Sequence, residues 1–528
     1  MKKSFKAILG LPVLAMTMSF LSGCGGFKKN GFAYDLDFNV DVRGQKIKMW
    51  AGFGSAIQDV LGDLLNEFER LTGVEVEYEN KSDYKGCLQA VTLAATSGKY
   101  PNVVVGYPDH FASYVKSDII VRLDYYFEND VHNPTFEPAG QRFTKDDFYA
   151  DYMVENQSIE FDENGKGYIL GLPFNKSTEV LVYNKSFFNY CAARDDLKDK
   201  IYVPRTYDEL ETVGQNILDF LSDNNLYNSV LKDANGKTVL NLNGIYDPTY
   251  SDATARFKPF SYDSQANLFI TNVRQNGGSY TEFDKTSKKG YLAFNSNETV
   301  TGLTQLKRLY DKKILGIPAD WGEAKYGSNP FKAFKTVMTL GSSAGVANDT
   351  TAGNKFEIGA APVPYVDAQR KYVISQGANL ALLDKGSREE RVASWQLVKF
   401  LSKYANGYFC SQTGYYPTCP YAEKEGGMWA NVDPKGIFHE EDYTSWLTQA
   451  KESLSTTDLI RAETAEVNLN SYIKDGEGWI KFIDPPFSGS ADIRDKVASI
   501  PPFVFTGNKT IQKALDDIYA ELSEYVRK

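Results

Sequence analysis

Hydrophobic residues in the first part of the chain alternate between strand-like runs and helical spacing. Strands that alternate with helices form parallel sheets, and such sheets bind their ligands beyond the carboxyl ends of the strands. We therefore expect Tyr84 and residues 107–110 to lie near a ligand-binding edge. The pattern predicts strands over 46–50, 74–78 and 103–105, separated by helices over 56–72 and 84–96.

The stretch from Gly171 to Lys185 changes character in its middle. Pro173 excludes a helix, and the apolar run 180–183 favours a strand. Between them, residues 175–178 are short polar side chains that offer many hydrogen-bonding groups. The pattern alone favours a surface loop that leads into a strand.

The second half of the chain repeats the alternation. Thr206 and Glu209 have the spacing of a capping box, which opens a helix toward Leu221. Further helices are predicted over 302–315, 388–401 and 510–525, and further strands over 336–340 and 356–359.

The first residues have the pattern of an export signal. Three lysines precede an apolar run over 7–20 that is too short to span a membrane. The run ends in Leu-Ser-Gly before Cys24, which resembles the lipobox of bacterial lipoproteins. That resemblance implies a signal peptide over 1–23, acylation of Cys24, and a linker over 24–43 that anchors the protein to the outer face of the cytoplasmic membrane.

Composition and charge exclude several functions. A net charge of -10 with no basic run argues against nucleic-acid binding. The three histidines are scattered, and the cysteines after Cys24 have no metal-ligand spacing, so we expect no metal and no cofactor. These later cysteines could instead form disulfides in an exported protein; they are Cys87, Cys191, Cys410 and Cys419.

The segment Gly341–Gly345 matches the G-x-S-x-G pattern of serine hydrolases and follows a predicted strand. In that interpretation Ser343 is the nucleophile and His439 a conceivable base. The polar residues after Gly345 are a poor start for the helix that must follow, and no acid partner can be singled out. The alternative is that Ser343 and nearby backbone N–H groups hold an anion without reacting with it.

Several motifs together resemble the extracellular solute-binding proteins of ABC importers, in particular their maltose-binding-like group. Four stretches are more similar to glycerol-3-phosphate-binding proteins than to maltose-binding ones, and Ile493-Arg494 is a fifth. The likeness runs from about Lys46 to the C-terminus, with insertions near 223–260 and 420–480. The four stretches are 173–178, 341–348, 375–380 and 412–417.

The resemblance implies a set of ligand-binding residues. Arg494 would supply the one full positive charge, suited to a phosphate ester. Asp109 stands one position after the place where the family has an acidic residue, and Tyr262 stands where the family has tryptophans. The solute can therefore be glycerol 3-phosphate, a glycerophosphodiester or a sugar. The implied residues are Tyr84, Ser177, Ser343, Gly377, Tyr415 and Arg494, and Asp109 and Tyr262 are the candidate replacements for the family's missing ligand contacts.

The resemblance also implies the fold and the partners. We expect a two-lobed α/β fold of the periplasmic-binding-protein type II, each lobe a mostly parallel sheet flanked by helices. Residues 173–178 would be the hinge crossing, with Ser177 facing the cleft. The protein would be a monomer and no enzyme. It would close on glycerol 3-phosphate or a related glycerophosphodiester, with an oligosaccharide as the alternative, and deliver this solute to the permease subunits. The expected lobes are 44–174 with 359–430, and 175–358 with 431–528.

Overall fold

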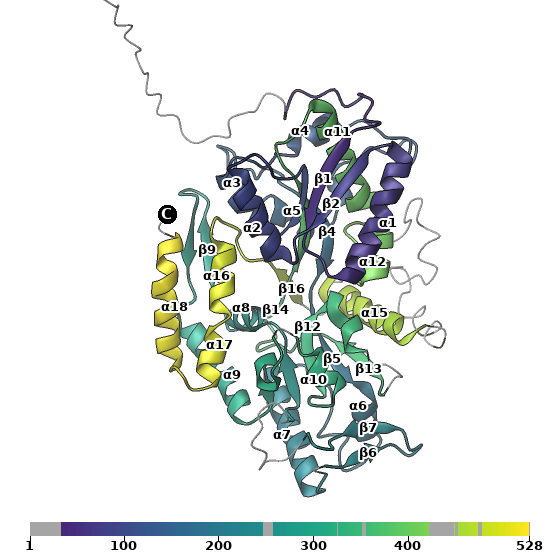
Figure 1. Cartoon of the computed structure of the whole chain (residues 1–528). Coiled ribbons are helices and arrows are strands. Elements are labelled where there is room, and N and C mark those ends of the chain that lie inside the picture. The colour runs from purple at the N-terminus through teal and green to yellow at the C-terminus, as the bar shows by residue number, and fades with distance from the viewer. Residues whose placement is uncertain are drawn as a thin grey trace, which may run out of the picture.

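The computed structural model describes residues 33–226, 228–245, 257–324, 326–350, 355–421, 448, 452, 454–473 and 478–526. The chain forms two α/β lobes, each built on a five-stranded sheet (Figure 1). The expected two-lobed fold is therefore confirmed. Cys24 and His439 lie outside the described residues.

The first sheet has the order β2-β1-β3-β15-β4. Strand β1 pairs in parallel with β2 and β3, whereas β15 pairs antiparallel with β3 and β4. The sheet is thus mixed rather than mostly parallel, because β15 returns from late in the sequence in the opposite direction. Its strands are β1 (Lys46–Ala51), β2 (Glu75–Asn80), β3 (Val103–Gly106), β4 (Leu172–Ser177) and β15 (Gln376–Leu382).

Helices cover both faces of the first sheet, so its central strands are apolar on both sides. Val103 and Val105 of β3 belong to the core beneath α1, while Val104 points to the opposite core beneath α2 and α3. The helices of this lobe are α1 (Ser55–Thr72), α2 (Tyr84–Ala95), α3 (Pro108–Lys116), α4 (Asp124–Asn129), α5 (Ala150–Asn156), α11 (Arg388–Lys399) and α12 (Asn406–Thr413).

The second sheet repeats the arrangement with the order β11-β8-β12-β5-β13, again two parallel and two antiparallel pairings. Strand β13 lies in this sheet, so the chain is still in the second lobe just after residue 358, where the return to the first was expected. The exact lobe limits stay a prediction. The strands are β5 (Glu179–Asn184), β8 (Phe260–Tyr262), β11 (Leu315–Gly316), β12 (Met338–Ser342) and β13 (Ile358–Ala361).

Helices of the second lobe surround one large core. The expected capping box of α7 is present, with the Thr206 hydroxyl and the Glu209 carboxylate each accepting a backbone N–H. The helix expected over 302–315 is shifted: α9 starts five residues earlier, where Ser296 caps it, and Leu315 belongs to a strand. The helices are α6 (Lys185–Ala192), α7 (Tyr207–Asp223), α8 (Gln265–Gln275), α9 (Asn297–Asp311), α10 (Ser328–Lys332), α16 (Ser490–Val497), α17 (Ile500–Phe505) and α18 (Ile511–Val526).

Small elements join or extend the lobes. Helix α15 (Thr456–Val467) contributes buried residues to the cores of both lobes. The first segment expected as an insertion includes the hairpin β6 (Val230–Lys232) and β7 (Thr238–Asn241). The second ends at the start of β16 (Trp479–Phe482), which pairs with β14 (Lys371–Ile374). A further hairpin consists of β9 (Thr281–Asp284) and β10 (Lys289–Leu292).

The chain crosses from the first sheet to the second at Thr178, the single residue between β4 and β5. Every residue from Leu172 to Glu179 is buried, so the surface-loop interpretation of this stretch is wrong. Several of its polar groups are tolerated because they have partners from distant segments. Lys176 pairs with Glu155, and the backbone N–H of Thr178 donates to Ser343 Oγ at 3.1 Å.

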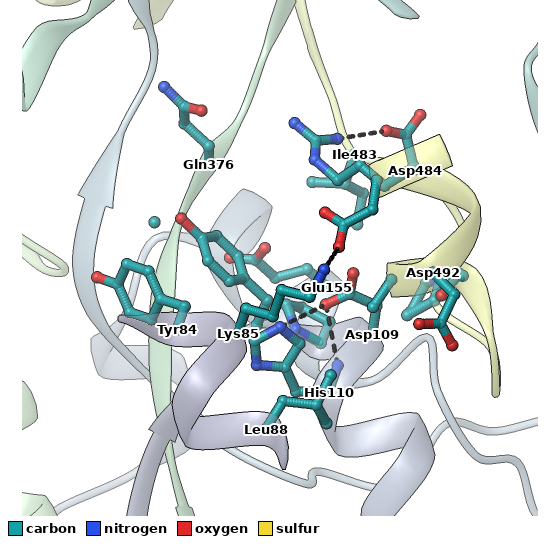
Figure 2. Close-up of a pocket in the computed structure, with 18 of the residues that line it drawn as sticks. Tyr84, Lys85, Leu88, Asp109, His110, Glu155, Gln376, Ile483, Asp484 and Asp492 are labelled. Atoms are coloured by element: carbon teal, nitrogen blue, oxygen red, sulfur yellow. Dashed lines mark hydrogen bonds and ion pairs between the residues drawn. The ribbon is translucent and has the colours of Figure 1, made fainter. Parts of the chain in front are cut away.

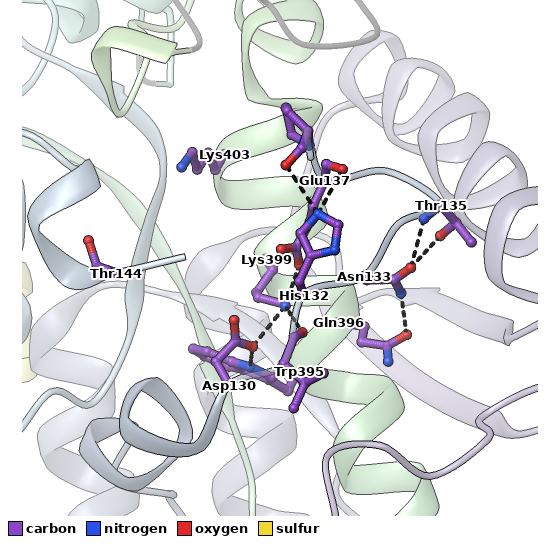
Figure 3. A network of polar contacts seen from close by, with 12 residues as sticks. Asp130, His132, Asn133, Thr135, Glu137, Thr144, Trp395, Gln396, Lys399 and Lys403 are labelled. Atoms are coloured by element: carbon purple, nitrogen blue, oxygen red, sulfur yellow. Dashed lines mark hydrogen bonds and ion pairs between the residues drawn. The ribbon is translucent and has the colours of Figure 1, made fainter. Parts of the chain in front are cut away.

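A second buried polar cluster lies inside the first lobe, away from the crossing (Figure 3). Lys399 of α11 is 2.8 Å from the Asp130 carboxylate and also pairs with Glu137, and all three side chains are almost fully buried. The Trp395 indole donates to Asp130 at 2.6 Å. This cluster ties α11 to the loop that follows α4.

Candidate functional site

A cavity of about 400 Å³ lies between the two lobes (Figure 2). The first lobe contributes the N-terminal ends of α2 and α3, and the second contributes residues 483–495, which lead into and form α16. Residues 374–377, at the start of β15, complete the wall. The cavity therefore lies beyond the carboxyl ends of β2 and β3, where ligands of such sheets bind.

Four of the residues expected to bind ligand line this cavity: Tyr84, Asp109, Gly377 and Arg494. The hydroxyl of Tyr84 accepts a 2.7 Å hydrogen bond from the Asn175 amide, and its ring packs edge-on against Tyr107. Gly377 has a φ of +101°, which a glycine adopts readily. A side chain there would meet the carbonyl oxygen of Asn175 in β4.

The other four expected residues are not among the described residues that line the cavity. Ser177 and Ser343 are 3% and 0% exposed and lie at the crossing between the sheets. Tyr262 is 1% exposed and donates its hydroxyl to Glu179 at 2.6 Å. Tyr415 stacks on Phe409 and interacts through its hydroxyl with Tyr84. These residues form a layer behind the cavity wall, and a direct contact with ligand stays a prediction for all eight.

Arg494 is held in the wall by two partners. Its guanidinium lies 3.4 Å from the Asp484 carboxylate and donates to the side-chain oxygen of Asn267. The Asn267 amide in turn donates to Glu179 at 2.7 Å and to Gln376 at 3.2 Å. The arginine is thus part of a network that runs from the cavity to the crossing.

Glu179, the first residue after the crossing, anchors this network. Burial raises the pKa of Glu179 to about 7, although the hydrogen bonds from Tyr262 and Asn267 act in the opposite direction. Asp484 behaves similarly: burial raises its pKa to about 6, and the nearby Arg494 opposes the rise. Burial thus favours the protonated form of Glu179 and Asp484, and their partners favour the ionised form.

The floor of the cavity contains a buried ion pair. Glu155 of α5 lines the cavity and pairs with Lys176 of β4, which also donates to the carbonyl of Gly377 at 3.2 Å. Burial raises the pKa of Glu155 and lowers that of Lys176, while their pairing opposes both shifts. This pair fixes α5 beneath the start of β15.

Carboxylates outnumber cations in the lining, which has only Lys85 and Arg494 as cations among the described residues. Three helices begin at the cavity, and each has an aspartate at its start: Asp83 caps α2, and Asp109 and Asp492 lie in the first turns of α3 and α16. A helix N-terminus attracts anions, and here the aspartate carboxylates already supply the negative charge at each N-terminus. The lining carboxylates are Asp83, Asp109, Glu155, Asp484, Asp492 and Asp495.

Sequence reasoning missed much of this lining. Glu155, Tyr280, Tyr326 and Asp484 line the cavity without standing in any quoted motif. A signal existed for Asp484, because it follows the run 479–483, apolar except for Lys481, and precedes two prolines, the arrangement expected where a strand ends at a binding edge. For the two tyrosines the sequence contains no comparable signal.

The family of the chain follows from its sequence. A family model described as a bacterial extracellular solute-binding protein matches residues 63–434. The chain belongs to this family. It is therefore an exported receptor of an ABC importer and not an enzyme, and Ser343, which is fully buried, is not a nucleophile of a hydrolase. No curated protein matches the sequence.

Solved structures with the same fold support the assignment. UgpB of Mycobacterium tuberculosis in complex with glycerophosphocholine has 16% identity and a TM-score of 0.63, over 92% of this chain and 99% of that one. The GacH receptor of Streptomyces glaucescens, solved unliganded and with acarbose, has 15% identity and a TM-score of 0.61, over 92% of this chain and 99% of that one. MalE of Bdellovibrio bacteriovorus bound to maltotriose has 15% identity and a TM-score of 0.58, over 92% of this chain and 100% of that one. At these identities the likeness shows the fold.

Two further findings concern the described residues only. None of their helices is long and apolar enough to cross a membrane. They also contain no group of three or more histidine, cysteine and carboxylate side chains arranged to hold a metal ion.

Proposed function

We propose that this receptor captures a carbohydrate between its lobes. The observation that carries the proposal is the lining of the cavity, which combines six carboxylates with four tyrosines, Tyr84, Tyr107, Tyr280 and Tyr326. Carboxylates accept hydrogen bonds from sugar hydroxyls, and tyrosine rings pack against the apolar faces of sugar rings. A cavity of about 400 Å³ has the size of a small-molecule site.

Glycerol 3-phosphate, the solute first expected from the motifs, suits this lining less well. A phosphate dianion would approach Asp109 and Asp492 at two helix starts that would otherwise attract it. The Arg494 guanidinium, its main attraction, is already bound to Asp484 and Asn267. A dianion would therefore have to displace an existing partner and overcome repulsion as well.

A glycerophosphodiester is the second candidate. It has one negative charge instead of two, so the lining carboxylates repel it less, although it too would compete with Asp484 and Asn267 for Arg494. UgpB, a structural neighbour of this chain, was solved with such a diester. This candidate keeps the phosphate contact implied by the motifs and reduces the repulsion.

The proposal includes how the receptor works. The lobes close on the solute about the crossing at Thr178, and the closed form is presented to the membrane subunits of the importer. We also propose that the protein is a monomer, anchored through an acylated Cys24, with lobes close to the limits expected from the sequence.

Calorimetric titration of the purified protein tests the choice of solute. The panel is maltotriose, cellobiose, glycerol 3-phosphate and glycerophosphocholine, each added to wild type, Arg494→Ala and the control Arg308→Ala, an exposed arginine on α9. We expect carbohydrate binding that Arg494→Ala alters little. Binding of glycerol 3-phosphate alone, lost in Arg494→Ala and kept in the control, would overturn the carbohydrate proposal.

A further inference from the structure

We propose that the solute of this cavity carries an organic ammonium group, bound by Asp109, Asp492 and the tyrosines beside them. The inference rests on the proposed capture of a small polar solute in the same cavity and concerns its charge. Two sources share this chemistry: an amino sugar and a choline ester.

The two cations of the described lining, Lys85 and Arg494, are each shared between several carboxylates. Lys85 of α2 pairs with Asp495 at 2.5 Å, and the charge of Asp492 also acts on it. Arg494 pairs with Asp484 and is influenced by Asp109 as well. Lys176, below the floor, pairs with Glu155. The six lining carboxylates thus exceed the cations that meet them.

Asp109 and Asp492 are the carboxylates left with the least compensation. Among the residues that the structure describes, no lysine or arginine forms an ion pair with either one. The only basic side chain of the described residues that pairs with Asp109 is His110, with 3.8 Å between ring nitrogen and carboxylate. Burial lowers the pKa of His110, so the ring is neutral at pH 7 and adds no positive charge.

Asp484 provides an independent sign of a missing partner. One of its carboxylate oxygens faces Arg494, while the other is shielded from solvent and has no hydrogen-bond partner among the described residues. A buried carboxylate oxygen without a partner is costly, and a ligand that donates a hydrogen bond removes the cost. Figure 2 shows Asp484, Asp109 and Asp492 around one side of the cavity, with Tyr84 on the other.

These three carboxylates also repel one another. The charge of Asp109 raises the pKa of both Asp484 and Asp492, in addition to the larger effect of burial on each. They come from α3 of the first lobe and from α16 and its preceding loop in the second, so repulsion opposes closure of the empty cleft. A cation bound between them would favour closure instead.

The aromatic side chains of the cavity suit the same ligand. Tyr84 and Tyr107 are in edge-on contact with ring centroids 4.9 Å apart, and Tyr280 and Tyr326 line the cavity from the second lobe. The faces of tyrosine rings attract ammonium groups, including quaternary ones that cannot donate hydrogen bonds. A metal ion is a poorer occupant, because the described residues contain no group of three ligands in suitable positions.

Two matched pairs of probes test the charge of the solute by calorimetry on the full-length protein. Chitobiose and cellobiose differ in amino groups, and glycerophosphocholine and glycerophosphoglycerol differ in the choline. We expect the ammonium member of at least one pair to bind about tenfold or more tightly than its partner, and the pair that responds identifies the source. If no ammonium compound binds more tightly than its partner without an ammonium group, the inference is wrong.

Variants locate the effect. Asp109→Asn and Asp492→Asn keep the shape and an acceptor oxygen but remove a charge, so each should reduce the affinity for the ammonium member about tenfold more than the affinity for its partner. Asp195→Asn is the control, since that side chain is 98% exposed on the second lobe. A preference that survives both cavity variants would overturn the assignment.

The outcomes separate this inference from the proposed function. Equal binding of chitobiose and cellobiose, together with no preference for glycerophosphocholine over glycerophosphoglycerol, leaves the carbohydrate proposal standing and rejects the ammonium group. Preference for glycerophosphocholine without any sugar binding supports the ammonium group and rejects the carbohydrate.

Discussion

Lys85 and Asp495 form a 2.5 Å ion pair that joins α2 of the first lobe to α16 of the second. Both residues line the cavity, and both side chains are more than half exposed, at 59% and 51%. The pair therefore connects the lobes at the rim of the cavity and is broken when the lobes separate.

Reversing one charge of this pair should weaken solute binding modestly. Lys85→Glu places two acidic side chains together and favours the open form, so we expect a loss of about two- to fivefold in affinity, as exposed pairs contribute little. Calorimetry measures the loss, and the swap Lys85→Glu with Asp495→Lys should recover most of it. If the double variant binds solute as weakly as Lys85→Glu alone, the pair does not stabilise closure.

The buried cluster around Lys399 should matter for stability and not for binding. Lys399→Met keeps much of the side-chain length but leaves Asp130 and Glu137 buried together without their cation. We expect the free energy of unfolding to fall by about 3 to 5 kcal/mol, the typical cost of breaking a buried pair. Urea denaturation measures this loss.

The control for Lys399 is an exposed pair on the same lobe. Arg70→Met removes an ion pair with Glu67 on the surface of α1 and should change stability little. Solute affinity should be unchanged in both variants, because the cluster lies away from the cavity. Equal stability of Lys399→Met and wild type would contradict the prediction.

The parts of the fold that were predictable from the sequence are those determined locally. Helices α1 and α7 follow from apolar spacing and, for α7, from the capping box of Thr206 and Glu209. Strand β1 follows from the alternation of lysines with apolar residues over 46–49, and β3 from a short apolar run. In each case the neighbours in sequence carry the information.

The buried polar crossing was not predictable, because its partners are distant in sequence. Lys176 is tolerated inside the protein through Glu155, and Thr178 is paired with Ser343. The cavity has the same difficulty: Asp484 and Arg494 approach Asp109 only after both lobes have folded. Comparison with the family identified four residues of the lining. The excess of carboxylates over cations around them could be seen only in the folded structure.

Gly377 should be intolerant of any side chain. Its φ of +101° is unfavourable for other residues, and a Cβ would lie 2.0 Å from the carbonyl oxygen of Asn175. Gly377→Ala must therefore displace β15 from β4 at the cavity wall. We expect a loss of about 2 kcal/mol or more in unfolding free energy, together with a loss of solute affinity.

A glycine with free space provides the matched comparison for Gly377. Gly345→Ala places a Cβ where no other atom lies within 4 Å, so stability and affinity should remain close to wild type. Thermal unfolding and calorimetry of the two variants measure the difference. Normal affinity in a stable Gly377→Ala protein would show that the start of β15 does not shape the cavity.

The raised pKa of Glu179 predicts that stability falls as the pH rises through the weakly acidic range. Its carboxyl group has the ordinary pKa of 4.5 in the unfolded chain and a pKa of about 7 in the folded protein, chiefly because it is buried there. Between these values the folded protein binds more protons than the unfolded one, so the free energy of unfolding decreases as pH rises from 4.5 to 7 and is flat with respect to this group above 7. The contribution is on the order of 3 kcal/mol.

Glu179→Gln isolates this contribution. The amide keeps an acceptor for Tyr262 or Asn267 and cannot ionise, so the variant should lose less stability than wild type between pH 5 and pH 8. Asp263 and Asp484, with raised pKa values of about 7 and about 6, act in the same direction in both proteins and cancel in the difference. Urea denaturation at a series of pH values gives the two slopes, and identical slopes would mean that Glu179 is not the group that titrates.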